Sequence, residues 1–308
     1  MRAQGQDLIA TSAPVSRNRV DFGRHFIPEV LTPLFFTPVY RELEVRHRLR
    51  YNQLQALYFN EQIVFFETLI GQGLMQGLLR AQWPADLRQK LEDLWEDERR
   101  HTEMFRQLNR TCAPVLYEHT DSCFIRVPHP WMALLRWTTR HPRAFPLYLW
   151  LMLLMEERSL YYSAQYIRAK ETLEPHFVGA YRAHLVDEAS HVRCDQELID
   201  RWWPSLPRAV RAFNARLLAW MVSEFFSAPR RGQLSVVRRL VGECPELRPR
   251  LPEIERQLLA LGSDDRYHSS IYSRDITPRC FAHFDAWPEF RALERVMPGY
   301  RSLGSQTA

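Results

Sequence analysis

Apolar residues recur every three to four positions through most of the chain, which is the pattern of amphipathic α-helices. Prolines and polar clusters interrupt this pattern and mark where helices end. We expect four long helices, at about residues 48–79, 84–109, 142–169 and 175–203. Short connections within the first pair and within the second pair predict two helical hairpins.

Shorter amphipathic segments follow the same period at about residues 131–138, 207–227, 231–242 and 252–261. Both ends of the chain lack this helical period and are rich in proline and in polar or aromatic residues. We therefore predict an N-terminal arm over residues 1–40, one helical domain over 41–262, and an irregular tail over 263–308 packed on the same domain. The predicted fold class is all-α, a four-helix core bundle with additional helices.

Composition narrows the class of protein further. The 308 residues are 46% hydrophobic and include only 11 glycines, which disfavours an all-β sandwich with many tight turns. The net charge of +5 is spread along the chain among acidic residues, so we expect no nucleic-acid binding. The longest apolar run, residues 145–155, is too short to span a bilayer, and we expect no membrane association.

The five cysteines form no CxxC pair and no even framework, and the first residues do not resemble a secretory signal. Free thiols of this kind are typical of proteins in a reducing compartment. We therefore expect a soluble, cytoplasmic protein.

The second and fourth predicted helices each carry an Asp-Glu-x-x-His sequence. It places Glu98 and His101 on one face of the second helix, and Glu188 and His191 on one face of the fourth. One Glu-x-x-His sequence arises often by chance, but two, each on the second helix of a hairpin, are a stronger signal. A dinuclear iron or manganese site in a four-helix bundle uses this pair and one Glu from each remaining helix.

The first helix offers Glu61 and Glu67 as the additional ligand. Ligands that meet across a hairpin lie about equally far from its turn. With the turn near Trp83, Glu67 is sixteen residues before it and Glu98 is fifteen residues after it. Glu61 lies six residues earlier, roughly 9 Å further along the axis. We therefore prefer Glu67, unless the turn is asymmetric.

The third helix offers the adjacent residues Glu156 and Glu157. Glu157 shares its face with Trp150, Leu153 and Leu160, whereas Glu156 has serines as well as apolar residues around it. An acid on an apolar helix face is unusual unless it points inward. We therefore prefer Glu157 as the ligand, although the contrast between the two is small.

His184 lies one turn before Glu188 on the fourth helix, so its ring can reach the same metal. Asp97 and Asp187 suit an outer role, in which a carboxylate accepts the far ring N–H of a ligand histidine and fixes its orientation. Asp195 lies on the same helical face and is a further candidate for such an outer position.

The motifs Glu98-x-x-His101 and His184-x-x-x-Glu188-x-x-His191, with Glu67 and Glu157, resemble the p-aminobenzoate N-oxygenase, or arylamine oxygenase, family of ferritin-like non-haem di-iron oxygenases. The likeness covers roughly residues 50 to 200. The additional histidine is its most specific point, because simple ferritins and most desaturases do not use it. The sequence of residues 97–101 also resembles the Asp-Glu-x-Arg-His motif of bacterial multicomponent monooxygenases, which weakens any assignment of substrate.

The resemblance implies a ferritin-like fold and O₂ activation at two iron ions held by Glu67, Glu98, His101, Glu157, His184, Glu188 and His191. It implies oxidation of an aromatic amine to a hydroxylamine, nitroso or nitro product in secondary metabolism, for example antibiotic biosynthesis. No flavin, nicotinamide or cluster motif is visible in the sequence. We therefore expect an external reductase or ferredoxin as the electron donor, and a homodimer.

Three alternatives stay open on the sequence alone. The donor set accepts manganese as well as iron. A carbon-oxidising desaturase or hydroxylase uses the same kind of centre. A ferritin-like iron-handling protein oxidises iron without any organic substrate.

Overall fold

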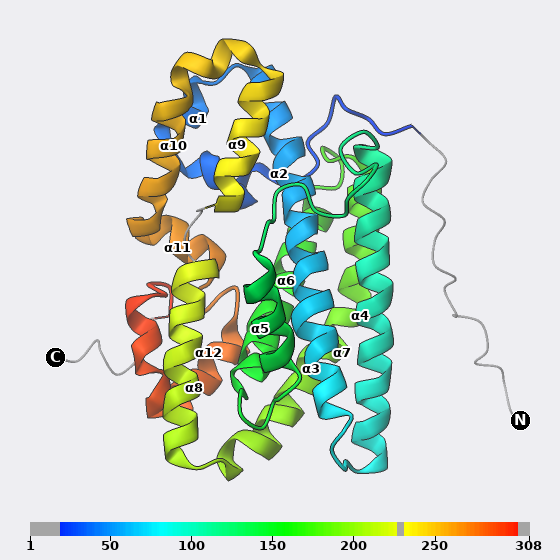
Figure 1. Cartoon of the computed structure of the whole chain (residues 1–308). Helices are drawn as coiled ribbons and strands as arrows, with labels where there is room; N and C mark the ends of the chain where they lie inside the picture. The colour runs from blue at the N-terminus through cyan, green and yellow to red at the C-terminus, as the bar shows by residue number, and fades with distance from the viewer. Residues whose placement is uncertain (1–18, 227–230, 301–308) are drawn as a thin grey trace, which may run out of the picture.

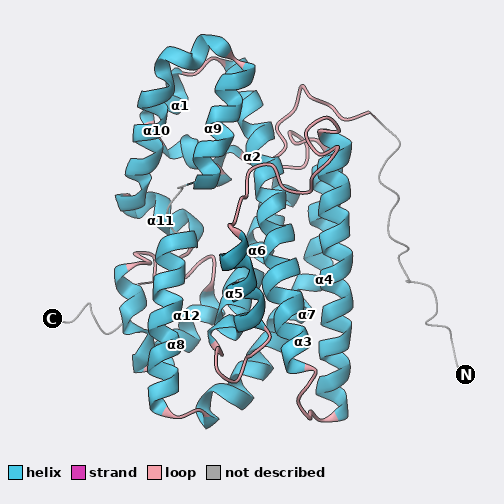
Figure 2. Ribbon diagram, viewed as in Figure 1, coloured by secondary structure: helices cyan, strands magenta, loops and turns pink. Residues whose placement is uncertain are grey.

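The computed structural model describes residues 19–226 and 231–300 of the chain. In these ranges the chain forms α-helices joined by turns and short 3₁₀ or π segments, and it forms no β-strand beyond one isolated bridge between His25 and Leu173 (Figure 2). The prediction of an all-α fold is confirmed.

Four long helical segments form the ferritin-like core, with α6 packed along α7 and α4 packed against both α2 and α7 (Figure 1). The first segment is continuous, because α2 passes through the π-helical turn η3 directly into α3. The bounds are α2 Val45–Phe66, η3 Glu67–Gly71, α3 Gln72–Leu78, α4 Ala85–Cys112, α6 Leu147–Arg168 and α7 Pro175–Trp202.

The core helices differ in how much of their surface is buried. Helix α4 buries a stripe with the helical period, including Leu87, Leu91 and Leu94, and exposes charged residues between them. Helix α6 is buried on all sides from Leu147 to Leu154. In the described part of the chain, no helix is both long and apolar enough to cross a membrane.

Shorter helices cover the bundle. Helix α9 packs on α2, and α10 packs on α9, at the end of the bundle opposite the turn between α3 and α4 (Figure 1). Helix α5 covers η3 and α3, and α8 packs against α6. Their bounds are α5 His129–Thr139, α8 Arg208–Met221, α9 Arg231–Glu243 and α10 Leu251–Ala260. Part of the helix that we predicted to end at residue 227 lies outside the described residues.

The described part of the N-terminal arm packs on the bundle. It contains the short elements η1 Glu29–Leu31, η2 Pro33–Phe36 and α1 Pro38–Glu42. The Asn52 side-chain oxygen accepts hydrogen bonds from the backbone N–H groups of Phe26 and Ile27, at 2.8 and 3.2 Å. The ring of Phe26 stacks on Phe177 of α7, with 4.6 Å between centroids.

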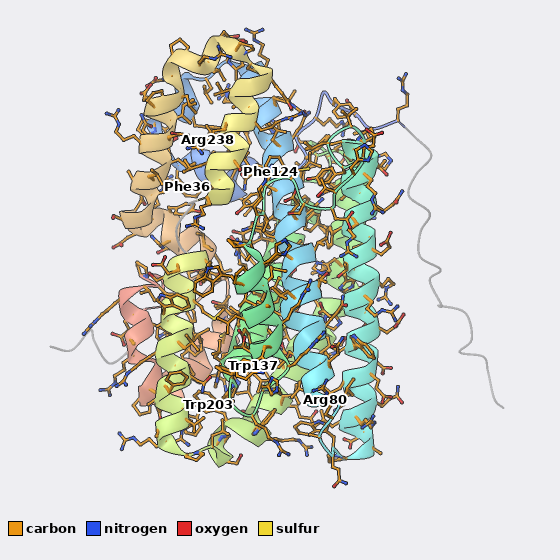
Figure 3. The ribbon with its side chains drawn as sticks, in the orientation of Figure 1. Phe36, Arg80, Phe124, Trp137, Trp203 and Arg238 are labelled. Atoms are coloured by element: carbon orange, nitrogen blue, oxygen red, sulfur yellow. The ribbon has the colours of Figure 1, made fainter. Side chains whose placement is uncertain are left out.

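The prediction of an irregular C-terminal tail is wrong. The segment after residue 263 forms α11 Asp265–Ile271, α12 Pro278–Ala286 and the 3₁₀ helix η8 Pro288–Arg295. Phe290 of η8 packs between Trp150 of α6 and Trp203, with centroid distances of 4.7 and 5.2 Å; Trp203 is labelled in Figure 3. These helices are too short to show a clear period; packing of α12 against α6 and of η8 against α8 stabilises the last two.

Candidate metal centre

Seven ionisable side chains from the four core segments meet inside the bundle. They form three overlapping groups, and in each group the candidate ligand atoms lie within 4.8 Å of one another. We call this set the buried cluster. Its members are Glu67, Glu98, His101, Glu156, His184, Glu188 and His191.

Local backbone features bring the first segment close to α4. Glu67 begins the π-helical turn η3, which changes the direction of its side chain relative to a regular helix. At the end of this turn, a Cβ atom on Gly71 would lie 3.1 Å from Oε2 of Glu98 and 3.6 Å from Met152. Glycine at this position therefore leaves room for the Glu98 carboxylate.

His184 lies between two cluster carboxylates. Its Nε2 is 2.8 Å from Oε1 of Glu188 and 3.3 Å from Oε1 of Glu67. Its other ring nitrogen, Nδ1, lies 3.2 Å from the hydroxyl of Ser159 on α6. Phe105 covers the ring edge-on at 5.1 Å. Residue spacing does not predict the Ser159 contact, because the contact joins the separate helices α6 and α7.

The other two cluster histidines present Nδ1 to the carboxylates. Nδ1 of His101 is 3.7 Å from Oε1 of Glu188. Nδ1 of His191 is 3.6 Å from Oε1 of Glu98 and 3.9 Å from Oε2 of Glu156. These separations exceed hydrogen-bond length and are of the size that a shared metal ion between the two atoms requires.

The outer nitrogens of these two histidines contact the aspartates of the opposite motif. Nε2 of His101 on α4 lies 3.0 Å from Asp187 on α7, and Nε2 of His191 on α7 lies 3.3 Å from Asp97 on α4. Arg100 joins both aspartates, at 2.8 Å from Asp97 and 2.6 Å from Asp187. Each aspartate therefore orients the histidine of the other helix, with Nδ1 directed to the cluster.

Three of the four cluster carboxylates have raised pKa values. Burial raises the pKa of Glu67 to about 7, and burial followed by the neighbouring Glu188 raises the pKa of Glu156 to about 7. Burial and then Glu156 raise the pKa of Glu98 well above its ordinary range. Outside the cluster the direction reverses, because the hydrogen bond from His101 lowers the pKa of Asp187 to about 2.

The unsatisfied atoms of the cluster fit metal ions. Both carboxylate oxygens of Glu98, and Nδ1 of His101 and of His191, are buried and have no hydrogen-bond partner among the described residues. Buried polar atoms are rarely left unpaired, so these atoms need a partner of another kind. Four carboxylates and three neutral imidazoles balance the charge of two divalent cations, and iron or manganese accepts such donors.

The structure corrects the preference for Glu157. Glu156 lies in the buried cluster, whereas the Glu157 carboxylate accepts hydrogen bonds from the backbone N–H groups of Arg279 and Cys280, at 3.0 and 2.8 Å. These amides are in the first turn of α12, so Glu157 caps that helix. The apolar face of α6 that carries Glu157 packs against α12, whereas the cluster lies on the side of α6 that carries Glu156.

The structure places Glu67 in the cluster and Glu61 outside it. The Glu61 carboxylate accepts hydrogen bonds from the backbone N–H groups of Cys123, Phe124 and Ile125, at 2.8 to 3.0 Å. The hydroxyl of Tyr117 donates to it at 2.7 Å. Glu61 therefore holds the loop between α4 and α5.

Asp195 is buried one turn beyond His191 and is not a member of the cluster. Neither of its carboxylate oxygens has a hydrogen-bond partner among the described residues. Burial, followed by the charge of Glu156, raises its pKa well above the ordinary range. The outer-position role predicted for Asp195 stays a prediction, because no described contact joins it to a cluster histidine.

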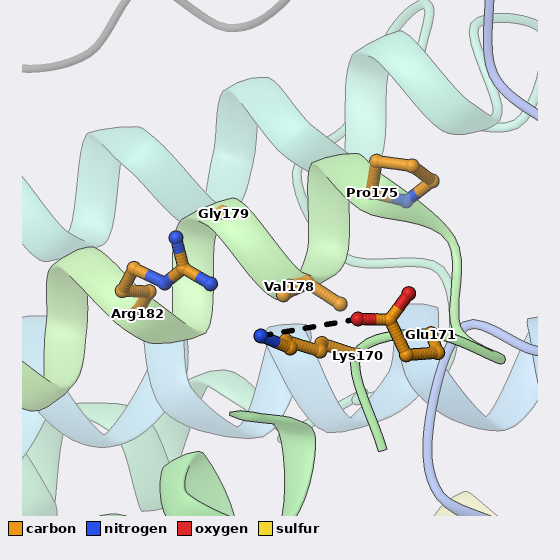
Figure 4. A pocket seen from close by; sticks show the side chains of 6 residues that line it. All are labelled: Lys170, Glu171, Pro175, Val178, Gly179 and Arg182. Atoms are coloured by element: carbon orange, nitrogen blue, oxygen red, sulfur yellow. Dashed lines mark ion pairs between the residues drawn. The ribbon is translucent and has the colours of Figure 1, made fainter. Parts of the chain in front are cut away.

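Two hollows on the described surface are lined by no residue of the cluster. One, of about 300 Å³, lies between the end of α6 and the start of α7, where Lys170 and Glu171 form an ion pair at 3.8 Å (Figure 4). A second, of about 580 Å³, lies between the α4–α5 loop and α9. Another group of possible ligands shares no residue with the buried cluster and consists of His47, Cys244 and Glu246. Arg46 already forms an ion pair with the Glu246 carboxylate at 3.0 Å.

Comparison with known proteins identifies the family. Residues 9–243 match the family model described as P-aminobenzoate N-oxygenase AurF. This match covers the four core segments and every residue of the buried cluster. No curated protein matches the chain.

Proposed function

The chain belongs to the P-aminobenzoate N-oxygenase AurF family, and we propose that it is a di-iron monooxygenase that oxidises the nitrogen of an aromatic amine. The observation that carries the proposal is the buried cluster, in which carboxylates and imidazoles from all four core segments converge and leave unsatisfied oxygen and nitrogen atoms on α4 and α7. The first product would be a hydroxylamine, and further cycles would give the nitroso and nitro compounds.

The seven cluster side chains would hold two iron ions, which supply the redox chemistry that activates O₂. In the first oxidation an amine, O₂, two electrons and two protons give a hydroxylamine and water. The two electrons have to enter from outside, and we propose a reductase or ferredoxin as their source. The substrate would be oxidised inside the bundle, where the buried cluster is shielded from bulk water.

The residues around the cluster prepare it for this role. Asp97 and Asp187 accept the outer ring protons of His191 and His101, which leaves the Nδ1 lone pairs free for metal. Arg100 compensates the charge of both aspartates. Phe105 and Met152 are fully buried beside the cluster and exclude water from it.

The proposal is tested by turnover of a defined amine. The protein is loaded with iron(II) under anaerobic conditions, reduced, and exposed to O₂ with 4-aminobenzoate or another arylamine. We expect hydroxylamino, nitroso or nitro products by mass spectrometry, with the new oxygen atom derived from ¹⁸O₂. The Glu98→Gln variant serves as the control without a complete cluster.

Other outcomes would contradict the proposal. Hydroxylation or desaturation at carbon would identify a carbon oxidase. Iron oxidation with no organic product for any amine tested would identify an iron-handling protein.

A further inference from the structure

Helix α5 presents an apolar face to solvent. Trp131, Leu134 and Trp137 follow one another at three-residue intervals, and their side chains are 54, 46 and 53% exposed. Trp137 is labelled on this helix in Figure 3. Among the described residues, no other helix exposes as many large hydrophobic side chains. Exposed apolar residues gathered on one short helix are typical of a surface that binds a partner.

The chain around α5 is basic and carries no acid. Residues 122–155 contain no aspartate or glutamate. The arginines of this range are all exposed, and none forms an ion pair with a described residue; they are Arg126, Arg136, Arg140 and Arg143. Other exposed arginines have an acid of the chain at hand, for example Arg88, which pairs with Glu92 at 3.0 Å. The charge around α5 is therefore complementary to an acidic partner.

Helix α5 covers the bundle beside the buried cluster (Figure 1). It packs on η3 and α3, and η3 begins with the cluster residue Glu67. The hydroxyl of Thr139, at the end of α5, lies 2.6 Å from the position that a Cβ atom on Gly73 would take. Glycine at this position therefore allows α5 to lie in close contact with the segment that carries Glu67.

A second contact joins α5 to the side of α6 that carries the cluster. The hydroxyls of Thr138 and Tyr148 are hydrogen-bonded at 2.7 Å. Tyr148, Met152 and the cluster residue Glu156 follow at four-residue intervals on α6, so they lie on one side of that helix. Met152 is 3.6 Å from the position of a Cβ atom on Gly71. The protein between α5 and the cluster is therefore packed and continuous.

We propose that the exposed face of α5, with Trp131, Leu134, Trp137, Arg136 and Arg140, binds an acidic electron-transfer protein. We call these residues the α5 surface. The partner would supply the two electrons that each oxygenation consumes, in two encounters if it is a one-electron donor, and it would leave oxidised by the same number of electrons. This inference rests on the proposed function, because it names the partner of that activity.

The burial of the cluster favours such a partner. All cluster side chains are buried, and neither of the two hollows on the described surface is lined by one of them. A protein donor therefore has to bind at the surface and pass electrons through the intervening protein. Encounters between redox proteins use small interfaces, and aromatic residues and arginine are enriched in interfaces generally.

A second copy of the chain fits the α5 surface less well. A twofold dimer places the same surface of both copies face to face. Arg136 and Arg140 would then meet their counterparts, and residues 122–155 contain no acid to offset the repulsion. An acidic partner of another kind meets opposite charges instead.

The first test measures binding without metal. The metal-free, full-length protein is titrated with an oxidised acidic [2Fe–2S] ferredoxin, with an acidic flavodoxin, and with basic cytochrome c as the control of opposite charge. We expect at least one acidic donor to bind, with an affinity that falls about tenfold or more from low to high salt. Cytochrome c should not bind.

Charge reversal locates the binding surface. We expect the double variant Arg136→Glu, Arg140→Glu to lose about tenfold to a hundredfold in affinity for the acidic donor. The double variant Arg182→Glu, Arg193→Glu makes the same change at exposed positions on α7 and should retain most of the affinity. Trp131→Ser should weaken binding at high salt as well as at low salt, because its contribution is apolar.

The second test measures electron transfer to the iron-loaded protein without O₂. Reduction by the acidic donor should be about tenfold slower in Arg136→Glu, Arg140→Glu than in the wild type, whereas dithionite should reduce both at the same rate. Failure of both acidic donors to bind, or equal affinities and rates in this variant and the wild type, would overturn the proposal. Binding of the α5 surface to anionic vesicles, or loss of a dimer in the variant with donor binding unchanged, would also overturn it.

The failure of this inference differs from the failure of the proposed function. N-oxygenation driven by dithionite, in a protein that binds neither acidic donor, would overturn the α5 surface and retain the reaction. Donor binding at α5 followed by iron reduction, with no N-oxygenated product from any amine, would contradict the reaction and retain the α5 surface.

Discussion

Two kinds of buried glutamate lie within a few turns of each other in this bundle. Glu61 and Glu157 are fully engaged by donors of the chain, mainly backbone N–H groups. Glu98 and Glu188 are equally buried, yet the oxygens of Glu98 have no hydrogen-bond partner in the described part of the chain, and Glu188 faces histidines of the cluster. Burial of an acid therefore does not identify a metal ligand; the convergence of several carboxylates and imidazoles, in place of backbone N–H donors, does.

The contrast has an energetic consequence. A glutamate that accepts backbone hydrogen bonds stabilises the loop or helix end that it holds. A glutamate that faces other carboxylates destabilises the metal-free fold, and binding of a cation removes this penalty. Replacing Glu by Gln, which keeps the shape and removes the charge, should therefore have opposite effects in the two groups.

The largest effect is expected for Glu98→Gln in the buried cluster. Loss of one charged ligand should abolish binding of the metal pair, because the remaining charge no longer balances two divalent ions. The metal-free variant should be at least as stable as the metal-free wild type, because Glu98 has no partner to lose. Iron analysis and urea unfolding measure the two quantities; a large loss of stability in the metal-free form would contradict this interpretation.

For Glu61→Gln we expect a loss of stability without a loss of bound iron. The new amide group would face backbone N–H donors of the α4–α5 loop, such as that of Phe124, so we expect a loss of about 3–5 kcal/mol in the free energy of unfolding. Iron bound per folded chain should not change. If this variant unfolds at the same urea concentration as the wild type, Glu61 is not a structural cap.

A smaller effect is expected for Asp187→Asn, next to the cluster. The amide no longer fixes the orientation of His101 as the carboxylate does, so metal affinity should fall by about tenfold to a hundredfold. Competition with a chelator measures this affinity. Asp93→Asn, at an exposed position on α4, is the control and should leave the metal affinity unchanged.

The smallest effect is expected in the pH dependence of the metal-free protein. The pKa values of Glu67 and Glu156 are raised to about 7, so the folded chain retains protons that the unfolded chain releases above about pH 4.5. The free energy of unfolding should therefore fall as pH rises from about 4.5 to 7, by at most about 1.4 kcal/mol per pH unit for each retained proton. A rise in stability over this interval would contradict the assignment.

The sequence was sufficient to predict the all-α fold, the four core segments and the family, because these depend on a helical period and on two repeated motifs. The comparison of distances from the turn selected Glu67 rather than Glu61, and the structure places Glu67 in the cluster. That argument works because α2, η3 and α3 are continuous and because the hairpin with α4 is nearly symmetric.

The wrong preference for Glu157 follows from the wrong prediction of an irregular C-terminal tail. Helix α6 is buried on all sides from Leu147 to Leu154, so an apolar face does not reveal which side meets the metal-binding residues. Helix α12 covers the side that carries Glu157, and its unpaired first-turn amides engage that carboxylate. The apolar face of Glu157 favours it as a ligand only as long as no helix of the tail is known to cover that face.

The central claim is that Glu156, and not its neighbour Glu157, completes the metal centre. The most direct test is the iron content of the Glu156→Gln and Glu157→Gln variants after anaerobic loading and desalting. We predict about two iron ions per chain in the wild type and in Glu157→Gln, and a clear loss of iron in Glu156→Gln. Retention of both ions in Glu156→Gln together with their loss in Glu157→Gln would contradict the assignment.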